Sequence, residues 1–479
     1  MRASFSLILI LLLVIAEPAR AVSKLDPQTV VDLALSKGLR ARQAELTAQR
    51  SYLGLAQALG VFDFNVTIAT GYEYDEAQSI SQNSNPLTKS MLTTVLLEKR
   101  FSTGTTLSLD YTDWQRNSTL SSFAASSGQQ PDATLNAVQL GLRQALLRNS
   151  FGYADRLAVE AARSTVDAAM ETREESLEGI LLETMTLFWT AYIAEQQLQQ
   201  NLSARDKYDQ LVKNVRRRAG FNLSSPGELP RLEAEYAATL ERVKTSSANY
   251  LNAIRTLRTA LLLEGDDELQ LVIPAEIPPV PQLSKRKVEE LRGYRVARTT
   301  LENANRTLDS YGNRARPQLD LIARAKSTGV DSDSGRALAE MGASTYPTYY
   351  VGVEFKTPLG SESARGVLAE AEVQKQIAEA DLMLQRNTLH DELENQERTV
   401  AANYSKARLA QETVTLRERV VREMESAYRV GRQPLVELIR SYNELFAAQL
   451  SRAQAVGQYH IALNALAAAR DELVTNVRR

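Results

Sequence analysis

The sequence has 479 residues, with 58 acidic and 56 basic side chains, two histidines and no cysteine. The absence of cysteine excludes disulfides, thiolate metal sites and cysteine nucleophiles. The nearly balanced charge gives no sign of a nucleic-acid partner, which a strongly basic face would indicate.

The first residues have the pattern of a removable secretory signal peptide. Arg2 gives a positively charged start, residues 5–16 are apolar but too short to span a bilayer comfortably, and Ala19-Arg20-Ala21 fits a cleavage site. We therefore predict a signal peptide over residues 1–21, cleaved after Ala21. No later stretch approaches about eighteen uninterrupted apolar residues, so the sequence predicts no transmembrane helix.

Long helices follow. Asp26 as N-cap and Pro27 at the first helical position predict a helix that runs to about residue 59. Apolar residues recur at helical spacing in five further segments, 153–219, 228–263, 285–313, 362–430 and 434–474. Residues 367–430 contain neither Gly nor Pro, so this helix alone would be roughly 95 Å long. Helices of that length, with apolar stripes rich in Ala, Leu and Val, predict coiled-coil-like packing rather than a compact globular domain.

Between the helices lie segments in which apolar and polar residues alternate, which is typical of β-strands. These segments are 62–74, 138–143, 318–326 and 349–356. The fuller ones have about the length that a tilted strand needs to cross a bilayer, with aromatic residues at their ends. A soluble antiparallel sheet with one wet face would show the same alternation.

Four such strands cannot close a barrel, because closed barrels start near about eight strands and open strand edges are not tolerated in lipid. If these strands lie in a membrane, several copies of the chain must therefore share one barrel.

The order of helix, strands, long helix, glycine break and helix occurs twice. We predict a first structural repeat over 22–271, a Pro-rich linker over 272–284 and a second repeat over 285–479, with matching breaks at Gly220 and Gly431. The first repeat holds an additional hairpin at about 88–115, which either adds two membrane-spanning strands or is a non-spanning extension. The sequence leaves open whether each chain supplies four or six spanning strands.

The layout and its local motifs resemble the TolC-like outer-membrane efflux protein family. Tyr428-Arg429-Val430-Gly431, followed by Pro434-Leu435-Val436-Glu437-Leu438, is similar to the turn that leads into that family's last helix. Thr357-Pro358-Leu359-Gly360 resembles the strand exit that opens the second long helix, and Leu146-Leu147-Arg148 near Gly152 resembles the matching exit in the first half.

This resemblance implies a mainly α-helical fold with membrane β-strands: a homotrimer with one shared transmembrane β-barrel in outer-membrane lipid, continued by a periplasmic tunnel of long helices. It also implies two partners, a periplasmic adaptor (membrane fusion) protein and an inner-membrane RND or ABC transporter. The glycine breaks at Gly220 and Gly431 are then expected to face the adaptor, and the channel acts as a passive conduit.

In the family, polar links near the last glycine break hold the inner end of the tunnel shut. The resemblance places this periplasmic gate at Tyr428, Arg432, Gln433, Glu437 and Arg440. Gln433 stands where a basic residue is expected, and Arg440 stands where a second acid would complete an acidic ring. Glu437 and Arg440 are three residues apart and could pair within one helix, in which case three copies would make a mixed-charge ring and not a purely acidic one. The alternative is an ordinary exposed ion pair on a helix. We therefore expect a mixed-charge gate.

An enzyme is not indicated. The sequence has no Gly-rich phosphate loop and no metalloprotease motif, and neither His390 nor His460 is followed by a second histidine four residues on, so we expect no cofactor and no catalytic or metal site. Three functions remain: an outer-membrane channel of a tripartite system for small-molecule efflux, the outer-membrane component of type I polypeptide secretion, and a periplasmic coiled-coil scaffold. The scaffold does not explain why strands of membrane-spanning length occur twice in matching positions.

Overall fold

The computed structural model describes residues 24–76, 87–128, 130–220, 227–263, 269–273, 276–282, 286–360 and 362–474. The predicted signal peptide over 1–21, with Ala21, lies outside the described residues. The chain divides into two compact units, which we call the helical unit (the described residues within 1–44, 174–286 and 390–479) and the strand unit (45–173 and 287–389). Each unit combines segments from both halves of the sequence, so the two predicted repeats are not two consecutive compact domains.

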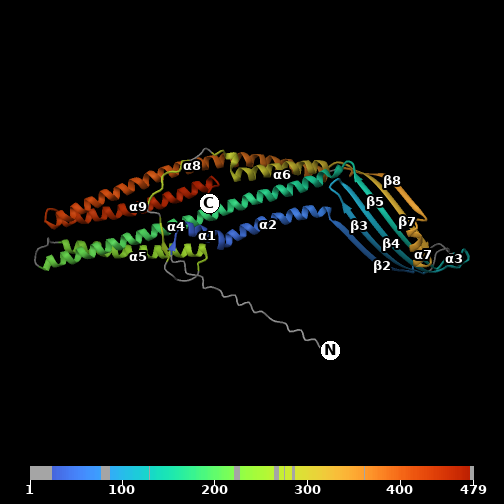
Figure 1. The fold of residues 1–479 in the computed structure, drawn as a ribbon, viewed down its shortest axis with the longest axis horizontal. Helices are drawn as coiled ribbons and strands as arrows, with labels where there is room; N and C mark the ends of the chain where they lie inside the picture. The colour runs from blue at the N-terminus through green and yellow to red at the C-terminus, as the bar shows by residue number, and fades with distance from the viewer. Residues whose placement is uncertain are drawn as a thin grey trace, which may run out of the picture. The chain divides into compact units, whose positions relative to one another are not determined.

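The helices lie close to their expected ranges (Figure 1). Both long helices, α4 and α8, have 68 residues and run without interruption through parts of both units. The helices are α1 (Pro27–Lys37), α2 (Leu39–Leu59), α4 (Tyr153–Gly220), α5 (Glu228–Leu261), α6 (Arg292–Arg314), α8 (Glu362–Arg429) and α9 (Leu435–Ala469). A two-stranded parallel pair, β1 (Lys24–Leu25) and β6 (Gln270–Leu271), was not expected from the sequence.

Two helix starts and stops differ from expectation. The predicted helix from Pro27 to residue 59 is two helices, because Gly38 has an extended backbone (φ −62°, ψ 121°) and interrupts it. Glycine favours the helical conformation less than other residues do, apart from proline. The helix expected from residue 285 begins only at Arg292, after a short 3₁₀ turn at Val288–Glu290. Leu291 is extended and 1% exposed, so its burial fixes a bend in the chain before α6.

The N-cap expected at Asp26 is present. Its Oδ1 accepts a hydrogen bond of 2.7 Å from the backbone N–H of Thr29, with Pro27 in the first turn. This hydrogen bond to the ionised form is the main reason why the pKa of Asp26 lies below its ordinary value.

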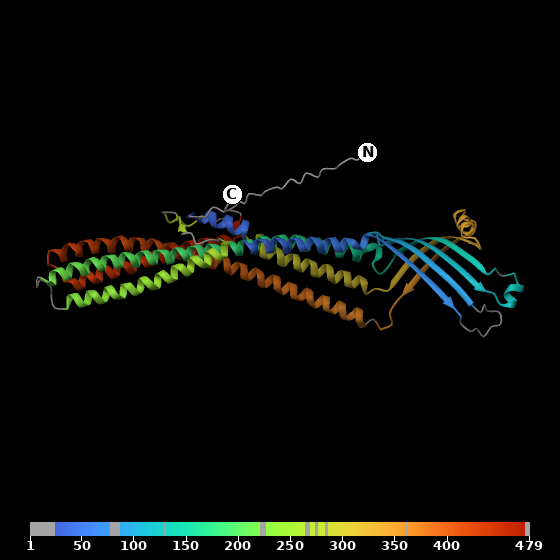
Figure 2. The ribbon, with the colours of Figure 1, turned by 90° about the horizontal axis from the view of Figure 1, so that it is seen from below.

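The core of the helical unit consists of three apolar clusters along the helices. One joins α1, α4 and α5 around Leu181, Phe188 and Leu257. A second, which contains Tyr208 and Leu438, joins the C-terminal part of α4 to α5, α8 and α9, which run side by side there (Figure 2). The third lies between α8 and α9, and the linker segment 276–282 packs on it through Ile277 and Val280. None of the described helices is long and apolar enough to cross a membrane.

The strand unit holds one antiparallel sheet of six strands in the order β2-β3-β4-β5-β7-β8. The strands are β2 (Phe64–Asp75), β3 (Leu87–Arg100), β4 (Thr105–Thr119), β5 (Asp132–Ala145), β7 (Gln318–Asp331) and β8 (Pro347–Lys356). The additional hairpin expected at about 88–115 is β3 and β4, which lie inside the sheet between β2 and β5 (Figure 1). Two short helices, α3 (Ser122–Ser126) and α7 (Ser334–Gly342), join strands at the end of the sheet away from the long helices.

His460, one of the two isolated histidines, lies on the buried side of α9 and is 9% exposed. Its ring stacks on that of Trp189 with the centroids 3.9 Å apart and the planes within 5°. Burial among apolar groups disfavours the charged imidazolium and lowers the pKa of His460 to about 4. The unfolded chain binds this proton near pH 6.5, so stability is lost as the pH falls from about 6.5 towards 4.

We therefore predict that acidification from about pH 7.5 to about pH 5 lowers the free energy of unfolding by about 2 kcal/mol through His460 alone. Chemical unfolding of the wild type and of His460→Phe, followed by circular dichroism, gives the free energy of unfolding at both pH values. The contribution of His460 is the amount by which acidification lowers this free energy more in the wild type than in the variant. His390→Phe serves as the control, because no buried aromatic stack surrounds His390. An identical pH dependence in wild type and His460→Phe would contradict the prediction.

Candidate functional site

One face of the six-stranded sheet is a continuous apolar surface, which we call the apolar face. The register places Val66 beside Leu97, Leu97 beside Leu109 and Leu109 beside Leu140, so one row of the face crosses four strands. The apolar side chains on this face are exposed or partly exposed in the single chain; those of the two edge strands include Phe64, Val66, Ile68 and Tyr72 in β2 and Tyr349, Val351, Val353 and Phe355 in β8, each at least 60% exposed. An exposed apolar surface of this extent marks an interaction with lipid or with another protein.

The opposite face of the sheet is polar and carries ion pairs between strands. Arg143 of β5 contacts Asp320 of β7 at 3.1 Å and Glu354 of β8 at 3.7 Å. Next to them, the guanidinium of Arg324 lies 5.6 Å from the ring centre of Tyr350. The expected alternation of apolar and polar residues is therefore a real division into two faces, although Ile322 is buried on the polar one.

Both outer strands of the sheet have an unpaired edge. In the described part of the chain, β2 pairs only with β3, and β8 pairs only with β7. Each edge leaves a row of backbone N–H and C=O groups without a partner in the sheet. A single chain therefore does not close this sheet into a barrel.

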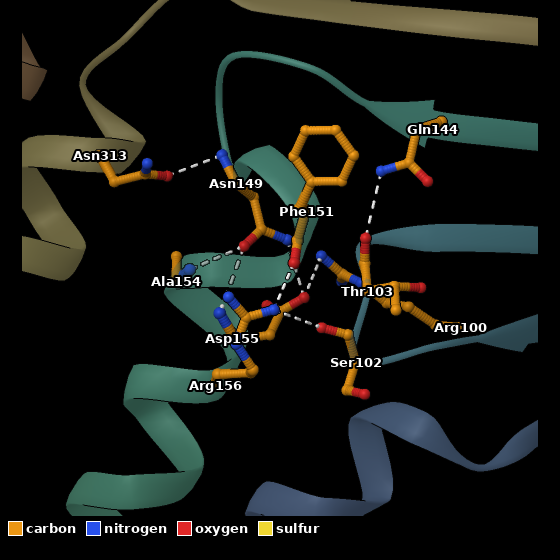
Figure 3. A network of polar contacts seen from close by, with 10 residues as sticks. All are labelled: Arg100, Ser102, Thr103, Gln144, Asn149, Phe151, Ala154, Asp155, Arg156 and Asn313. Atoms are coloured by element: carbon orange, nitrogen blue, oxygen red, sulfur yellow. Dashed lines mark hydrogen bonds and ion pairs between the residues drawn. The ribbon is translucent and has the colours of Figure 1, made fainter.

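The strand sheet is tied to α4 by two close turns (Figure 3). The turn between β3 and β4 meets the turn between β5 and α4 so closely that a Cβ atom on Gly104 would lie 2.4 Å from the backbone N of Gly152. A Cβ atom on Gly152 would lie 2.1 Å from the carbonyl oxygen of Ser102. Both glycines also have positive φ, of 71° and 73°, which L side chains rarely adopt.

Polar contacts complete this junction (Figure 3). The side-chain oxygen of Asn149 accepts hydrogen bonds from the backbone N–H groups of Ala154 and Asp155, at 2.9 and 3.2 Å, and so caps the start of α4. Asp155 pairs with Arg100, the last residue of β3, at 2.8 Å. Arg156 donates to the carbonyl oxygen of Ser102 at 3.1 Å. The end of the extra hairpin is thus built into the first turn of the long helix.

The predicted gate residues lie where α8 turns into α9, in the helical unit. Gly431 has a φ of 71° and ends α8 in a Schellman motif: its N–H donates to the Tyr428 carbonyl at 3.1 Å, and the N–H of Arg432 donates to the Ala427 carbonyl at 2.9 Å. The other break residue, Gly220, is the last residue of α4, and the six residues that follow it are outside the described part. Arg432 and Glu437 are exposed and Gln433 is partly exposed.

Tyr428 makes the link that joins two helices at this end. Its hydroxyl accepts a hydrogen bond of 3.2 Å from Arg218 of α4, whose guanidinium also lies 5.6 Å from the tyrosine ring centre. Partial burial raises the pKa of Tyr428, and the nearby Arg218 opposes that shift. The ends of α4 and α8 are therefore held together by a neutral phenol and an arginine.

Arg440 does not pair with Glu437, as the spacing had suggested, but with Glu444 one turn further along α9, at 3.1 Å. Glu444 also pairs with Arg417 of α8, which draws it to that side of the helix. Because Glu444 is held by both arginines, this part of the tip carries charges of both signs, as does the residue set predicted for the gate.

Sequence reasoning missed three polar residues at this tip: Arg218, Glu425 and Tyr442. The hydroxyl of Tyr442 in α9 donates to Glu425 of α8, and burial together with this hydrogen bond raises the pKa of the tyrosine. Lys207 of α4 lies 3.6 Å from the same carboxylate. Only the tertiary packing of α4, α8 and α9 brings these residues together, although the Arg216-Arg217-Arg218 run before Gly220 was a visible signal.

Comparison with known proteins gives one family match and several similar folds. Residues 293–470 match the family model described as outer membrane efflux protein. The fold is similar to that of the Campylobacter jejuni CmeC outer membrane channel, with 12% identity, a TM-score of 0.68, and coverage of 94% of this chain and 88% of that one. No curated protein sequence matches the chain.

Two further solved structures are similar in fold. The outer membrane protein VceC from Vibrio cholerae has 14% identity and a TM-score of 0.65, over 92% of this chain and 95% of that one. The Neisseria gonorrhoeae MtrE outer membrane channel, solved in its open state, has 14% identity and a TM-score of 0.66, over 93% and 89%.

An antiparallel sheet with an exposed apolar face, together with helices of 68 residues, defines the fold class: mainly α-helical, with long helices and one antiparallel β-sheet. Residues 293–470 match the model of the outer membrane efflux protein family, and the whole fold is similar to that of TolC-like outer-membrane channels.

We predict that Gly152→Ala destabilises the strand unit by about 2 kcal/mol or more, because the new methyl group would meet the Ser102 carbonyl and the backbone would be strained. Gly54→Ala is the matched control: Gly54 lies within α2, with open space around it, and alanine favours helices by about 1 kcal/mol. Thermal unfolding should show a lower midpoint for Gly152→Ala and an equal or higher one for Gly54→Ala. Equal midpoints for wild type and Gly152→Ala would refute the packing described for the junction.

Proposed function

We propose that three copies of this chain close one β-barrel in the outer membrane and form the passive outer conduit of a tripartite export system for small molecules. The observation that carries this proposal is the six-stranded sheet with an exposed apolar face and two unpaired edges. In lipid each unpaired backbone group costs several kcal/mol, so such a sheet is stable only when its edges are closed.

A second copy of the chain fits these edges best. Strand β2 has all of its residues exposed and β8 all but two, so none of the described residues covers them. The sheet order puts β2 at one end and β8 at the other, and pairing β8 of one copy with β2 of the next repeats the same contact around a ring. The number three follows from the TolC-like family resemblance.

The proposed partners also follow from the TolC-like family resemblance. We propose a periplasmic adaptor (membrane fusion) protein, facing the glycine breaks at Gly220 and Gly431, and an inner-membrane RND or ABC transporter that supplies the energy. The exposed Arg432 and Glu437 next to Gly431 offer both charge signs to such an adaptor. Type I polypeptide secretion is the alternative use of the same conduit, while the family match disfavours a periplasmic scaffold.

The closed ring can be tested with introduced cysteines, because the chain has none of its own. Thr70 in β2 lies on the apolar face, as do Tyr349, Val351 and Val353 in β8. We predict that Thr70→Cys combined with a cysteine at one of these three β8 positions gives disulfide-linked dimers and trimers on oxidation. Non-reducing gels of outer-membrane fractions measure the ladder, and each single cysteine is the control. A chain that stays monomeric in every combination, or fractionates with soluble periplasmic protein, would rule out the proposed ring.

The gate at Tyr428, Arg432, Gln433, Glu437 and Arg440 is part of this proposal. The Tyr428–Arg218 hydrogen bond supports it, because it links two helices beside the break at Gly431. Opening the tip would require such links to separate.

We predict that Tyr428→Phe, which removes only the hydroxyl that accepts from Arg218, raises the open probability of single channels in planar bilayers by at least about 5-fold, the equivalent of about 1 kcal/mol for the hydrogen bond lost in each chain. Tyr404→Phe, the same change elsewhere in α8 on a tyrosine that packs against Tyr459, is the control. An unchanged open probability in Tyr428→Phe would remove Tyr428 from the gate.

A further inference from the structure

The extra hairpin formed by β3 and β4 makes the first half of the chain differ from the second. Between its helices the second half has two strands, β7 and β8, whereas the first half has four, β2 to β5. The helices that follow are matched, with α4 and α5 in the first half corresponding to α8 and α9 in the second. The duplicated plan alone would therefore give four strands per chain.

The hairpin is a full part of the sheet and not an appendage to it. Strands β3 and β4 have 14 and 15 residues, as long as their neighbours β5 and β7, which have 14 each. Every residue of β2 pairs with one of β3, from Phe64↔Lys99 to Asp75↔Thr88. On its other side the hairpin pairs β4 with β5 over thirteen positions, from Thr105↔Gln144 to Asn117↔Asp132.

The two faces of the sheet also continue across the hairpin. The register places Val95 and Leu97 of β3, and Leu109 and Tyr111 of β4, on the apolar face in line with Ile68 and Leu140. The other face of the hairpin carries Thr94, Glu98, Ser108, Asp110 and Thr112, together with Leu92 and Leu96. A hairpin that stood in water would have no reason to keep the apolar side chains of both strands on the same face as those of β2 and β5.

The position of the hairpin's turn fixes how far the hairpin reaches. Residues 101–104 lie against the first turn of α4, held by Arg100–Asp155, by Arg156 and by the close contact of Gly104 with Gly152 (Figure 3). The other ends of β3 and β4 lie at the opposite end of the sheet, beside α3. The hairpin therefore runs the whole height of the sheet.

From these observations we infer that all six strands of each chain span the membrane, so that a ring of three chains is a barrel of eighteen strands instead of the twelve that the duplicated plan would supply. This inference rests on the proposed function, which places the sheet in the outer membrane. Barrel diameter grows roughly linearly with strand number, so eighteen strands make a barrel about 1.5-fold wider, with about twice the cross-section.

The widening is confined to the strands. Among the described residues no additional long helix matches the hairpin, since α4 and α8 have the same length of 68 residues and each is followed by one long helix. The wider barrel would restrict the size of passing solutes less than a twelve-stranded one. Such a channel suits bulky solutes that a twelve-stranded barrel would retard.

Site-directed spin labelling of the full-length protein in lipid vesicles tests the inference directly. Single cysteines at Val95, Leu97, Leu109 and Tyr111 should place nitroxides in contact with lipid-dissolved oxygen, whereas labels at Thr94, Glu98, Asp110 and Thr112 should contact a water-soluble nickel complex. Matched controls are Ile68 and Asn65 in β2 and Val351 and Tyr350 in β8, which should show the same alternation because these strands belong to the sheet in either case.

Two contrary outcomes are distinguishable. If β2 and β8 alternate between lipid and water but both faces of β3 and β4 contact the nickel complex, the eighteen-stranded barrel is wrong and the proposed channel stands. If the controls in β2 and β8 do not contact lipid, the proposed function itself fails.

A second measurement gives the width. A variant lacking residues 87–119 would connect β2 to β5 as β7 connects to β8. Electron-microscopy projections of detergent-solubilised trimers down the barrel axis should show a ring about 1.5-fold wider for the wild type than for this variant. Equal ring diameters would overturn the inference, and should the variant not assemble, the spin-label pattern of the wild type decides it.

Discussion

The hydrogen bonds of an open sheet are the constraint on which the rest of this structure depends. A sheet with two free edges and one apolar face has only one stable arrangement in lipid, which is closure with further copies of itself. The alternation that builds the apolar face is local, but the closure is not, because β2 and β8 come from opposite halves of the chain and form the two ends of one sheet. The proposed closure of the sheet by further copies follows from these edges.

The junction between the sheet and the helices must satisfy a second constraint, which is a sharp change in the direction of the chain. Strands and long helices in the strand unit must change direction within a few residues, and the chain does this at a series of positive φ angles, at Asn149, Phe151 and Gly152. Asn149 then provides the cap that the first turn of α4 needs. Because Gly104 and Gly152 approach one another without side chains, the hairpin and the helix are coupled there.

At the helical tip, polar links hold packed helices in place without making the tip purely acidic or purely basic. Arg218 reaches Tyr428, Glu425 accepts from Tyr442, and Glu444 is shared by Arg417 and Arg440. These links are partly exposed, so each contributes little to stability by itself, as the gate proposed for this tip would require.

The sequence by itself determined the elements whose cause is local. The N-cap at Asp26, the long helices up to Gly220 and Gly431, and the alternation along Phe64–Asp75 follow from capping, helical spacing and a period of two, which neighbouring residues impose. Only the tertiary structure decided features that join distant segments: the place of β3 and β4 inside the sheet, the stack of Trp189 on His460, and the choice of Glu444 over Glu437 by Arg440. These depend on which surfaces meet, and neither periodicity nor residue spacing contains that information.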